Sequence, residues 1–154
     1  FRANYEFYKP RSMDFSSMSY VIHAISGRVV GDLDEAYRNF LITAGEDLDE
    51  GLTGRGDVPD GLHGTATGGA WMAAVFGFGG VHLTPDRLYV DPALPRGWTR
   101  LAFPLRLRGE RLDFEVTPER VRITCGTEAS LELPARVCGR DVVLRSGETF
   151  VIDQ

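Results

Sequence analysis

The chain has 154 residues, of which 43% are hydrophobic and 25% are charged, and this balance is typical of a soluble globular protein. Its formal net charge of -5 leaves no basic stripe that could neutralise phosphates, which argues against a nucleic-acid-binding protein. No apolar run approaches the roughly 20 residues that a membrane-spanning helix needs.

The chain begins at Phe1 without an initiator methionine or a signal-peptide pattern, and we expect it to be a piece of a longer protein.

The first predicted elements are two helices joined by a short turn. Helical spacing predicts a helix from about Ser17 to Val30, with an apolar face made of Met18, Val21, Ile22, Ile25 and Val29. Gly31 ends it, and Asp32 is suited to cap a second helix, whose apolar face is Leu33, Ala36, Tyr37, Phe40 and Leu41. Such a pair packs as an antiparallel hairpin.

A long connector separates this hairpin from a third predicted helix. It runs from about Gly45 to Gly64, is rich in glycine and aspartate, and is longer than most connectors of compact domains. Three of its acidic residues lie close together and are interpreted as solvated surface charges, namely Asp47, Asp49 and Glu50. The third helix is expected from about Thr67 to Phe76 and ends at Gly77.

Beyond Gly80 the apolar residues alternate with period two, which is typical of strands. The predicted strands are Val81–Leu83, Arg87–Val90, Thr99–Phe103, Leu105–Arg108, Leu112–Thr117, Val121–Thr124, Ala129–Leu133, Val142–Leu144 and Thr149–Ile152. Gly109-Glu110 and Pro118-Glu119 are interpreted as hairpin turns. Many short strands with frequent turns indicate a small sandwich, in which Cys125 and Cys138 are expected to be free thiols.

The segment Asp60–Trp71, DGLHGTATGGAW, places an imidazole, hydroxyls and glycines near a helix start. The first N–H groups of a helix have no intrahelical acceptor and carry partial positive charge. Together with His63, Thr65 and the close backbone approach that Gly64 allows, they are the parts of a phosphate site. The same glycines would also suit a tight packing joint between helices, with His63 as an ordinary loop residue. Both interpretations are open at this point.

The segment Arg11–Ile25, RSMDFSSMSYVIHAI, supplies a second set of hydroxyls. Ser16 and Ser17 stand where a helix begins, and N-capping accounts for only one of them. The other hydroxyl could face the same anion, whereas Arg11 could either reach that anion or hold Asp14. No metal-ligand spacing and no nucleophile elbow is found in the chain. The residues alone therefore indicate a candidate anion site without naming a reaction.

Three successive segments resemble the C-terminal part of glycoside hydrolase family 65, the maltose, trehalose and kojibiose phosphorylases with their hydrolase relatives. The segments cover roughly residues 5 to 117 and are FYKPRSMDFSSMSYVIHAISGRVVGDLDEAYRNF, GLHGTATGGAWMAAVFGFGG and LYVDPALPRGWTRLAFPLRLRGERLDFEVT. The second is similar to the family's G-I-H motif, which is followed by small residues and a tryptophan. The third resembles the family's N/D-P-x-L-P-x-x-W pattern before its C-terminal strands.

The resemblance implies an α+β chain in which residues 1–80 are the closing helices of an (α/α)6 catalytic barrel and residues 81–154 a small antiparallel β-sandwich. It also implies an inverting disaccharide phosphorylase. Inorganic phosphate attacks the anomeric carbon of an α-glucoside, a glutamic acid protonates the departing oxygen, and β-glucose 1-phosphate forms. In the family that acid lies upstream of this segment, so we expect no catalytic residue here and no activity of the segment alone.

Carried over to this sequence, the phosphate-binding residues are Ser16, Ser17, His63, Gly64 and Thr65. No metal and no cofactor is implied. The implied partners are inorganic phosphate, an α-linked disaccharide and the rest of the catalytic chain, with neither nucleic acid nor membrane. A cytoplasmic location is expected, and a homodimer is one assembly that is left open.

Two alternatives stay open. Family phosphorylases typically carry a His-Asp or His-Glu pair just before the serines, where this chain has Asp14-Phe15, and a trehalose-type hydrolase of the same family is the first alternative. The second is a non-catalytic carbohydrate-binding module formed by the β half. That module would need exposed aromatic rings such as Tyr89 and Trp98, which we expect to be packed instead.

Overall fold

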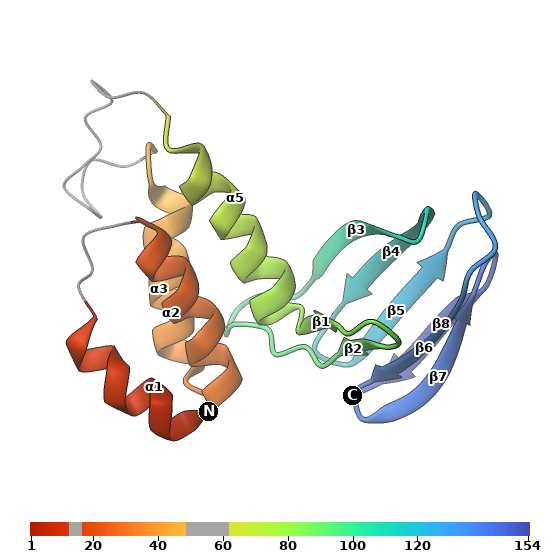
Figure 1. Cartoon of the computed structure of the whole chain (residues 1–154), viewed down its shortest axis with the longest axis horizontal. Helices are drawn as coiled ribbons and strands as arrows, with labels where there is room; N and C mark the ends of the chain where they lie inside the picture. Colours follow the sequence, from red (N-terminus) through yellow and green to blue (C-terminus); the bar gives the residue numbers. More distant parts are fainter. Residues whose placement is uncertain (13–16, 49–61) are drawn as a thin grey trace. The chain divides into compact units, whose positions relative to one another are not determined.

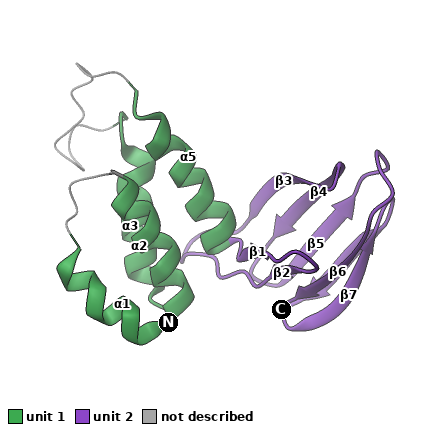
Figure 2. Cartoon of the chain, viewed as in Figure 1, with its two compact units in different colours: residues 1–78 green, residues 79–154 purple. Residues whose placement is uncertain are grey.

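The computed structural model describes residues 1–12, 17–48 and 62–154, with residue 17 described through its backbone alone. The chain divides into two compact units, a helical unit 1, Phe1–Phe78, and a unit 2 built of strands, Gly79–Gln154 (Figure 2). It is therefore an α+β chain. None of the described helices combines the length and the apolar character that crossing a bilayer requires.

Unit 1 consists of short helical elements (Figure 1). They are α1 (Arg2–Tyr8), the 3-10 turn η1 (Lys9–Arg11), α2 (Ser17–Val30), α3 (Leu33–Gly45), α5 (Gly64–Met72) and the π-helical stretch η3 (Ala73–Phe78). The predicted bounds of α2 are confirmed, and so is the cap of α3, since the Asp32 side chain accepts a hydrogen bond from the Glu35 N–H at 3.2 Å. Helix α1 was not predicted. Helix α5 begins three residues earlier than predicted, because the His63 carbonyl already accepts the first helical hydrogen bonds.

Small residues allow the helices of unit 1 to approach closely. A Cβ atom on Gly27 would lie 3.3 Å from the Cβ of Ala36, so α2 and α3 are nearly in backbone contact there. A Cβ on Gly69 would overlap the side chain of Val21, so Val21 of α2 packs directly on the backbone of α5. Both contacts depend on the missing side chain of a glycine.

The buried side of α2 and α3 differs from the apolar faces that the sequence predicts. In α2, Val21 and Ala24 are buried, but Ile22 and Val29 are 56% and 50% exposed. In α3 the buried residues are Ala36, Asn39 and Thr43. The predicted apolar face is thus only partly buried within unit 1, because helical spacing identifies apolar positions without showing which neighbour covers them.

Unit 2 consists of two four-stranded sheets. Its strands are β1 (Val81–Leu83), β2 (Leu88–Val90), β3 (Leu101–Leu107), β4 (Glu110–Val116), β5 (Arg120–Cys125), β6 (Glu132–Val137), β7 (Arg140–Arg145) and β8 (Thr149–Asp153). The sheet orders are β1-β2-β6-β7 and β3-β4-β5-β8. One pair corrects the predicted antiparallel sandwich, because β2 and β6 run parallel with Leu88 opposite Ala135. After β2 the chain forms β3, β4 and β5 of the second sheet. It then returns to the first sheet as β6, which runs parallel to β2.

Two strand predictions around the β3–β4 hairpin were wrong. A single strand, β3, runs through Pro104, where two strands were predicted; β3 is an edge strand, and a proline is tolerated there. Glu110 is not a turn residue but the first residue of β4. The turn is Arg108-Gly109, with φ values of 53° and 85°, which match the twist of the flanking strands.

A fully buried carboxylate joins one end of this hairpin to the rest of unit 2. Glu110 accepts hydrogen bonds from the N–H of Ala129 at 3.0 Å, the hydroxyl of Ser146 at 2.9 Å, and the N–H groups of Glu128 at 3.2 Å and Arg111 at 3.0 Å. Burial alone would raise the pKa of Glu110, but these donors outweigh it and hold the pKa below its ordinary value. The Ala129 N–H thus pairs with a side chain rather than with a strand, and β6 begins at Glu132, later than predicted.

The core of unit 2 lies between the two sheets and is made of large apolar side chains. The Phe103 and Phe114 rings stack there with their centroids 5.0 Å apart. Both cysteines are free thiols, as predicted; Cys125 is buried and Cys138 is partly buried. Burial raises the pKa of both thiols.

Candidate functional site

His63 stands at the start of α5 and is its N-cap residue. Its carbonyl accepts the N–H groups of Ala66 at 2.8 Å and Thr67 at 3.2 Å, while the Gly64 N–H donates to Leu62 at 3.1 Å. Among the described residues, no acceptor is recorded for the Thr65 N–H. The α5 N-terminus therefore offers one imidazole and one N–H group in the partial positive charge of a helix start.

The carboxylate of Asp47 holds His63 at two points. One oxygen, Oδ2, accepts the His63 backbone N–H at 2.7 Å, and the other, Oδ1, lies 2.6 Å from Nδ1 of the imidazole ring. The neighbouring Glu46 has its Oε1 4.0 Å from the same ring nitrogen. Asp47 is in the turn after α3 and His63 is sixteen residues later, so this contact closes the connector between α3 and α5.

The interpretation of Asp47 as a solvated surface charge was wrong. Its side chain is only 7% exposed, against 38% for His63. The hydrogen bond from the His63 ring, and next that from its backbone, hold the pKa of Asp47 below its ordinary value. Sequence reasoning missed this residue because its partner is far along the chain. The only signal is an aspartate in an acidic stretch just after a helix end. The other two acidic residues, Asp49 and Glu50, lie outside the described residues.

The glycines of α5 do not all serve one purpose. Gly69 packs against Val21, as the packing interpretation expects, but a Cβ atom on Gly64 or Gly68 would meet nothing within 4 Å. Packing thus explains one glycine of the three. The hollow that borders Gly64 and Gly68 is lined by Ala44, Glu46, Asp47, Leu48, Leu62, Gly64, Thr67, Gly68 and Ala70. Its charged side chains are both acidic, so this hollow itself does not suit an anion.

Of the predicted phosphate-binding residues, the structure describes three together at the α5 N-terminus, namely His63, Gly64 and Thr65. Ser17 is the first residue of α2, and nothing further is described of it. Ser16 lies outside the described residues, and so does the pair Asp14-Phe15. The proposed meeting of the serines with His63 stays a prediction.

Arg11, the other residue considered for an anion, makes local contacts. Its Nη1 donates to the Phe7 carbonyl at 2.7 Å, and its guanidinium lies 4.2 Å from the centre of the Phe7 ring. The guanidinium is therefore engaged within its own helical segment. Its alternative partner, Asp14, lies outside the described residues.

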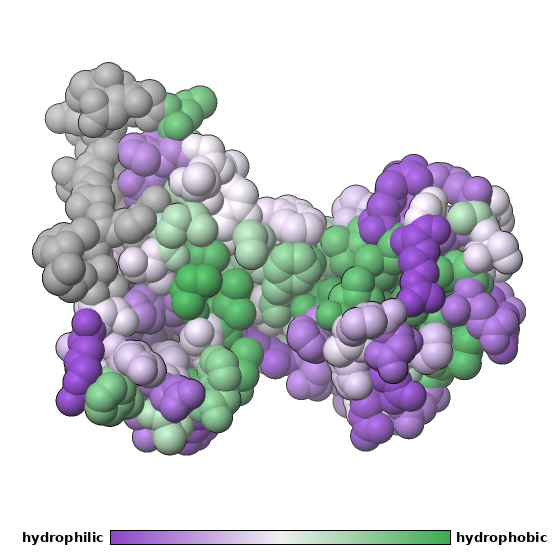
Figure 3. Space-filling model, viewed as in Figure 1, coloured by the Kyte–Doolittle hydropathy of each residue, from purple (hydrophilic) through white to green (hydrophobic). Residues whose placement is uncertain are grey.

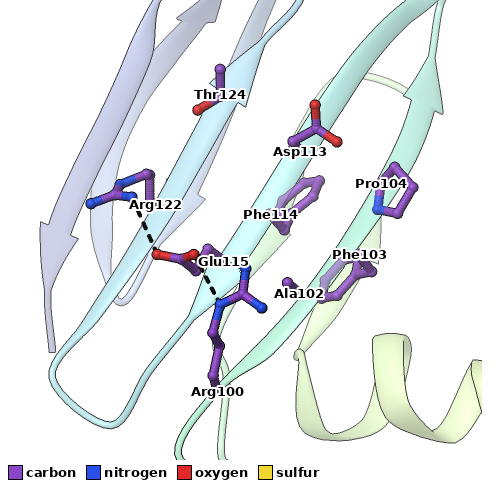
Figure 4. A pocket seen from close by; sticks show the side chains of 9 residues that line it. All are labelled: Arg100, Ala102, Phe103, Pro104, Asp113, Phe114, Glu115, Arg122 and Thr124. Atoms are coloured by element: carbon purple, nitrogen blue, oxygen red, sulfur yellow. Dashed lines mark hydrogen bonds and ion pairs between the residues drawn. The ribbon is translucent and has the colours of Figure 1, made fainter.

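A second candidate site is a shallow hollow over β3, β4 and β5 of unit 2 (Figure 4). It is lined by Arg100, Ala102, Phe103, Pro104, Asp113, Phe114, Glu115, Arg122 and Thr124. Arg100 and Arg122 both donate to Glu115, at 3.0 and 3.2 Å, so each of the two guanidinium groups has a partner in the same carboxylate. The two phenylalanine rings are buried. The hollow thus offers no exposed ring for a sugar to stack on.

The aromatic residues considered for a sugar platform are only partly exposed. Tyr89 is half-buried in β2, with its ring 5.9 Å from that of His82, and Trp98 is half-buried in the turn before β3. The only large hydrophobic side chains of unit 2 that are classed as exposed are the aliphatic Leu83 and Val151. Unit 2, which is described throughout, therefore has no exposed aromatic platform of the kind that many carbohydrate-binding surfaces use.

Comparison with known families gives a consistent result over both units. Residues 1–72 match the profile described as the glycosyl hydrolase family 65 central catalytic domain. Residues 82–144 match the profile described as the glycosyl hydrolase family 65, C-terminal domain. The two matches follow one another in the chain and leave few residues outside them.

Individual relatives are phosphorylases. The chain is 37% identical to a kojibiose phosphorylase of Halothermothrix orenii over 96% of its own length and 19% of the relative's. It is 36% identical to a 1,2-alpha-glucosylglycerol phosphorylase of Bacillus selenitireducens over 93% of the chain and 19% of the relative, and 36% identical to an alpha,alpha-trehalose phosphorylase of Thermoanaerobacter brockii over 78% and 15%. A solved structure, a putative kojibiose phosphorylase from human microbiome, aligns with a TM-score of 0.85 and 29% identity over 97% of the chain and 19% of that structure. The chain thus spans about a fifth of the length of these relatives.

Proposed function

The chain belongs to glycosyl hydrolase family 65, and from this premise we propose that it is the C-terminal segment of an inverting disaccharide phosphorylase. The complete enzyme would cleave an α-glucoside with inorganic phosphate and release β-glucose 1-phosphate. The names of the relatives support phosphorolysis, because kojibiose, trehalose and glucosylglycerol phosphorylases are all among them.

In this proposal, residues 1–80 are the closing helices of an (α/α)6 catalytic barrel, and residues 81–154 are the C-terminal β-sandwich domain. The surface of unit 1 supports the first assignment, since apolar patches are exposed on its helices (Figure 3). Among them are Ile22, Val29 and Trp71, which would be covered by further helices of a barrel. The family match over residues 1–72 supports the same assignment.

The phosphate would be held by Ser16, Ser17, His63, Gly64 and Thr65. The observation that carries this proposal is the placement of His63: its ring stands at the N-terminus of α5, fixed by Asp47 on the Nδ1 side and partly exposed. The Nε2 side of the ring and the Thr65 N–H can then donate to phosphate oxygens. Gly64 would contribute through its missing side chain rather than its N–H, which donates to Leu62.

The chemistry that follows is a single displacement. Phosphate held at the start of α5 attacks the anomeric carbon from one side while an acid on the other side protonates the departing oxygen, so configuration inverts. Positioning of the phosphate is the contribution of this segment. The acid is expected in the part of the protein that precedes this segment, so we expect the segment alone to be inactive.

The direct test is a product assay on the complete protein. It is incubated with kojibiose, trehalose, maltose and nigerose, with and without phosphate, and β-glucose 1-phosphate is measured. Phosphate-dependent formation of this product is expected. Free glucose formed equally well without phosphate would overturn the proposal and favour the hydrolase alternative, to which the departure at Asp14-Phe15 points.

The variant His63→Ala tests the site itself. We expect the KM for phosphate to rise by about tenfold or more, because a charge-assisted hydrogen bond to the anion is lost. The KM for the disaccharide should change far less. His82→Ala, which removes the exposed histidine of β1, is the matched control and should leave both constants unchanged. An unaltered phosphate KM in His63→Ala would remove His63 from the site.

A further inference from the structure

Asp47 contacts His63 through both oxygens of its carboxylate. One oxygen accepts the His63 backbone N–H at 2.7 Å, and the other lies 2.6 Å from the ring nitrogen Nδ1. These two contacts fix the rotation of the ring as well as its position. The backbone hydrogen bond holds the carboxylate in place, and a rotation of the ring would break the contact at Nδ1. The imidazole therefore presents its opposite nitrogen, Nε2, away from the carboxylate.

The backbone at Asp47 belongs to the turn that ends α3. The Leu48 N–H donates to the Gly45 carbonyl at 3.0 Å, Glu46 is extended, and Asp47 has a φ of 66°. This is the pattern of a type II turn, whose third residue needs a positive φ that aspartate tolerates better than most residues. The turn places the Asp47 carboxylate beside the start of α5.

The two side chains differ in how much of each is exposed to solvent. The Asp47 side chain is 7% exposed, whereas the His63 side chain is 38% exposed. An anion that approaches the start of α5 can touch the imidazole but is kept from the carboxylate. The negative charge of Asp47 therefore interacts with the ring at close range. The ring separates this charge from the anion, so the repulsion between the two is weaker.

The tautomer of the ring follows from the same geometry. Because Nδ1 faces a carboxylate, it carries a hydrogen, and a neutral ring would then have only a lone pair at Nε2. A lone pair cannot donate to a phosphate oxygen. His63 can therefore donate a hydrogen bond from Nε2 to a phosphate oxygen only as the imidazolium ion.

The charges described around the ring favour that ion. Asp47 and Glu46 are acidic, and α5 adds no titratable side chain between Gly64 and Met72. The N-terminus of α5 opposes a positive ring, but with about half a unit of charge spread over several N–H groups. A full negative charge at 2.6 Å, reinforced by a second at 4.0 Å, is the larger effect.

We propose that Asp47 is a positioning residue for phosphorolysis, which fixes the His63 ring and keeps it in the protonated form that binds the attacking phosphate. This inference rests on the proposed function and adds to it a residue that acts on phosphate only through His63. A purely structural alternative is that Asp47 merely ties the connector to α5. The two differ in whether loss of the Asp47 charge moves the pH dependence of phosphate binding.

The decisive variant is Asp47→Asn in the complete enzyme, because the asparagine oxygen can still accept the Nδ1 hydrogen while the charge is gone. The amide nitrogen cannot accept the His63 backbone N–H, so that second contact is lost as well. We expect the phosphate KM at neutral pH to rise about tenfold, with the disaccharide KM within about twofold. We also expect the alkaline limb of kcat/KM for phosphate to move to lower pH by about one unit, since the imidazolium loses its counter-charge. Asp34→Asn, the same change at an exposed aspartate of α3, is the matched control.

A double-mutant cycle with His63→Gln shows whether Asp47 acts through the ring. Once His63 is replaced, adding Asp47→Asn should change the phosphate KM no further. If Asp47→Asn does not give folded protein, Asp47→Ser is measured in the same cycle. An unchanged phosphate KM and pH limb in these variants, or effects that add in full to His63→Gln, would overturn this inference and leave the proposed function standing. Lack of phosphate-dependent turnover by the wild-type enzyme would overturn both.

Discussion

The two units of the chain bury their apolar residues very differently. Of the buried hydrophobic residues in the described part of the chain, eight lie in unit 1 and sixteen in unit 2. Of the exposed large hydrophobic residues, eleven lie in unit 1 and two in unit 2. The buried residues of unit 1 are mostly alanine and valine, whereas those of unit 2 include Leu112, Phe114, Ile123 and Leu133.

This difference indicates that unit 2 closes its own core and that unit 1 does not. A domain that folds by itself needs a continuous interior of large side chains, because only their burial offsets the lost chain entropy. Unit 2 has such an interior between two sheets. Unit 1 joins its helices through small residues and leaves large ones outside, as expected of helices that are completed by neighbours from the rest of a longer chain.

The largest effect is expected when the two units are separated. Residues 79–154 expressed alone should fold and melt cooperatively, whereas residues 1–78 alone should melt without a sharp transition and bind an apolar dye, because their exposed side chains lack a cover. Circular dichroism melts and dye fluorescence measure both. A sharp, reversible melt of residues 1–78 would break the comparison, and so would an unfolded residue 79–154 fragment.

A smaller effect is expected from enlarging a small residue in unit 1. In the complete protein, Gly69→Ala should lower the free energy of unfolding by about 1–3 kcal/mol, since the new Cβ overlaps Val21. Adding Val21→Ala should restore part of that loss. Gly68→Ala, whose Cβ meets open space, is the control. Chemical denaturation measures all of these variants, and equal losses for Gly69→Ala and Gly68→Ala would contradict close packing at α2.

The smallest effect is expected in unit 2 and depends on pH. The pKa of Glu110 is lower in the folded protein than its ordinary value of 4.5, so its contribution is present above pH 4.5 and is lost as the pH falls through the folded value. We expect the melting temperature of the wild type to fall by a few degrees, about 3 °C, more than that of Glu110→Gln over the same acid range. Glu119→Gln, at an exposed turn, is the control and should follow the wild type. Parallel curves for Glu110→Gln and wild type would show that the network around Glu110 does not sense pH.

Local patterns predicted most of the elements but not all of their neighbours. The bounds of α2 and the cap at Asp32 were confirmed because spacing and capping act within one or two turns of helix. The β3–β4 turn was misplaced by one residue, since either Arg108-Gly109 or Gly109-Glu110 suits a hairpin until the strand register decides. Helix α1 had no distinct signal in its sequence.

In the candidate site, too, the consecutive residues were predicted and the contact between distant residues was not. His63, Gly64 and Thr65 were predicted together because they are consecutive and the motif around them resembles that of a family. Asp47 could not be found, because nothing in an acidic stretch after a helix indicates which of its residues has a partner sixteen residues away. The meeting of Ser16 and Ser17 with His63 stays a prediction, since it depends on residues outside the described part of the chain.

Three properties can be read from the amino-acid order: the helix and strand periods, the change from helices to strands near Gly80, and the motifs of glycosyl hydrolase family 65. These properties are local, and each is set by the spacing of a few neighbouring residues. Three others became known from the folded chain: which face of α2 is buried, that β2 and β6 run parallel, and that Asp47 holds His63. Those features bring distant parts of the chain together, and their outcome depends on the combined packing of many residues rather than on any single pattern.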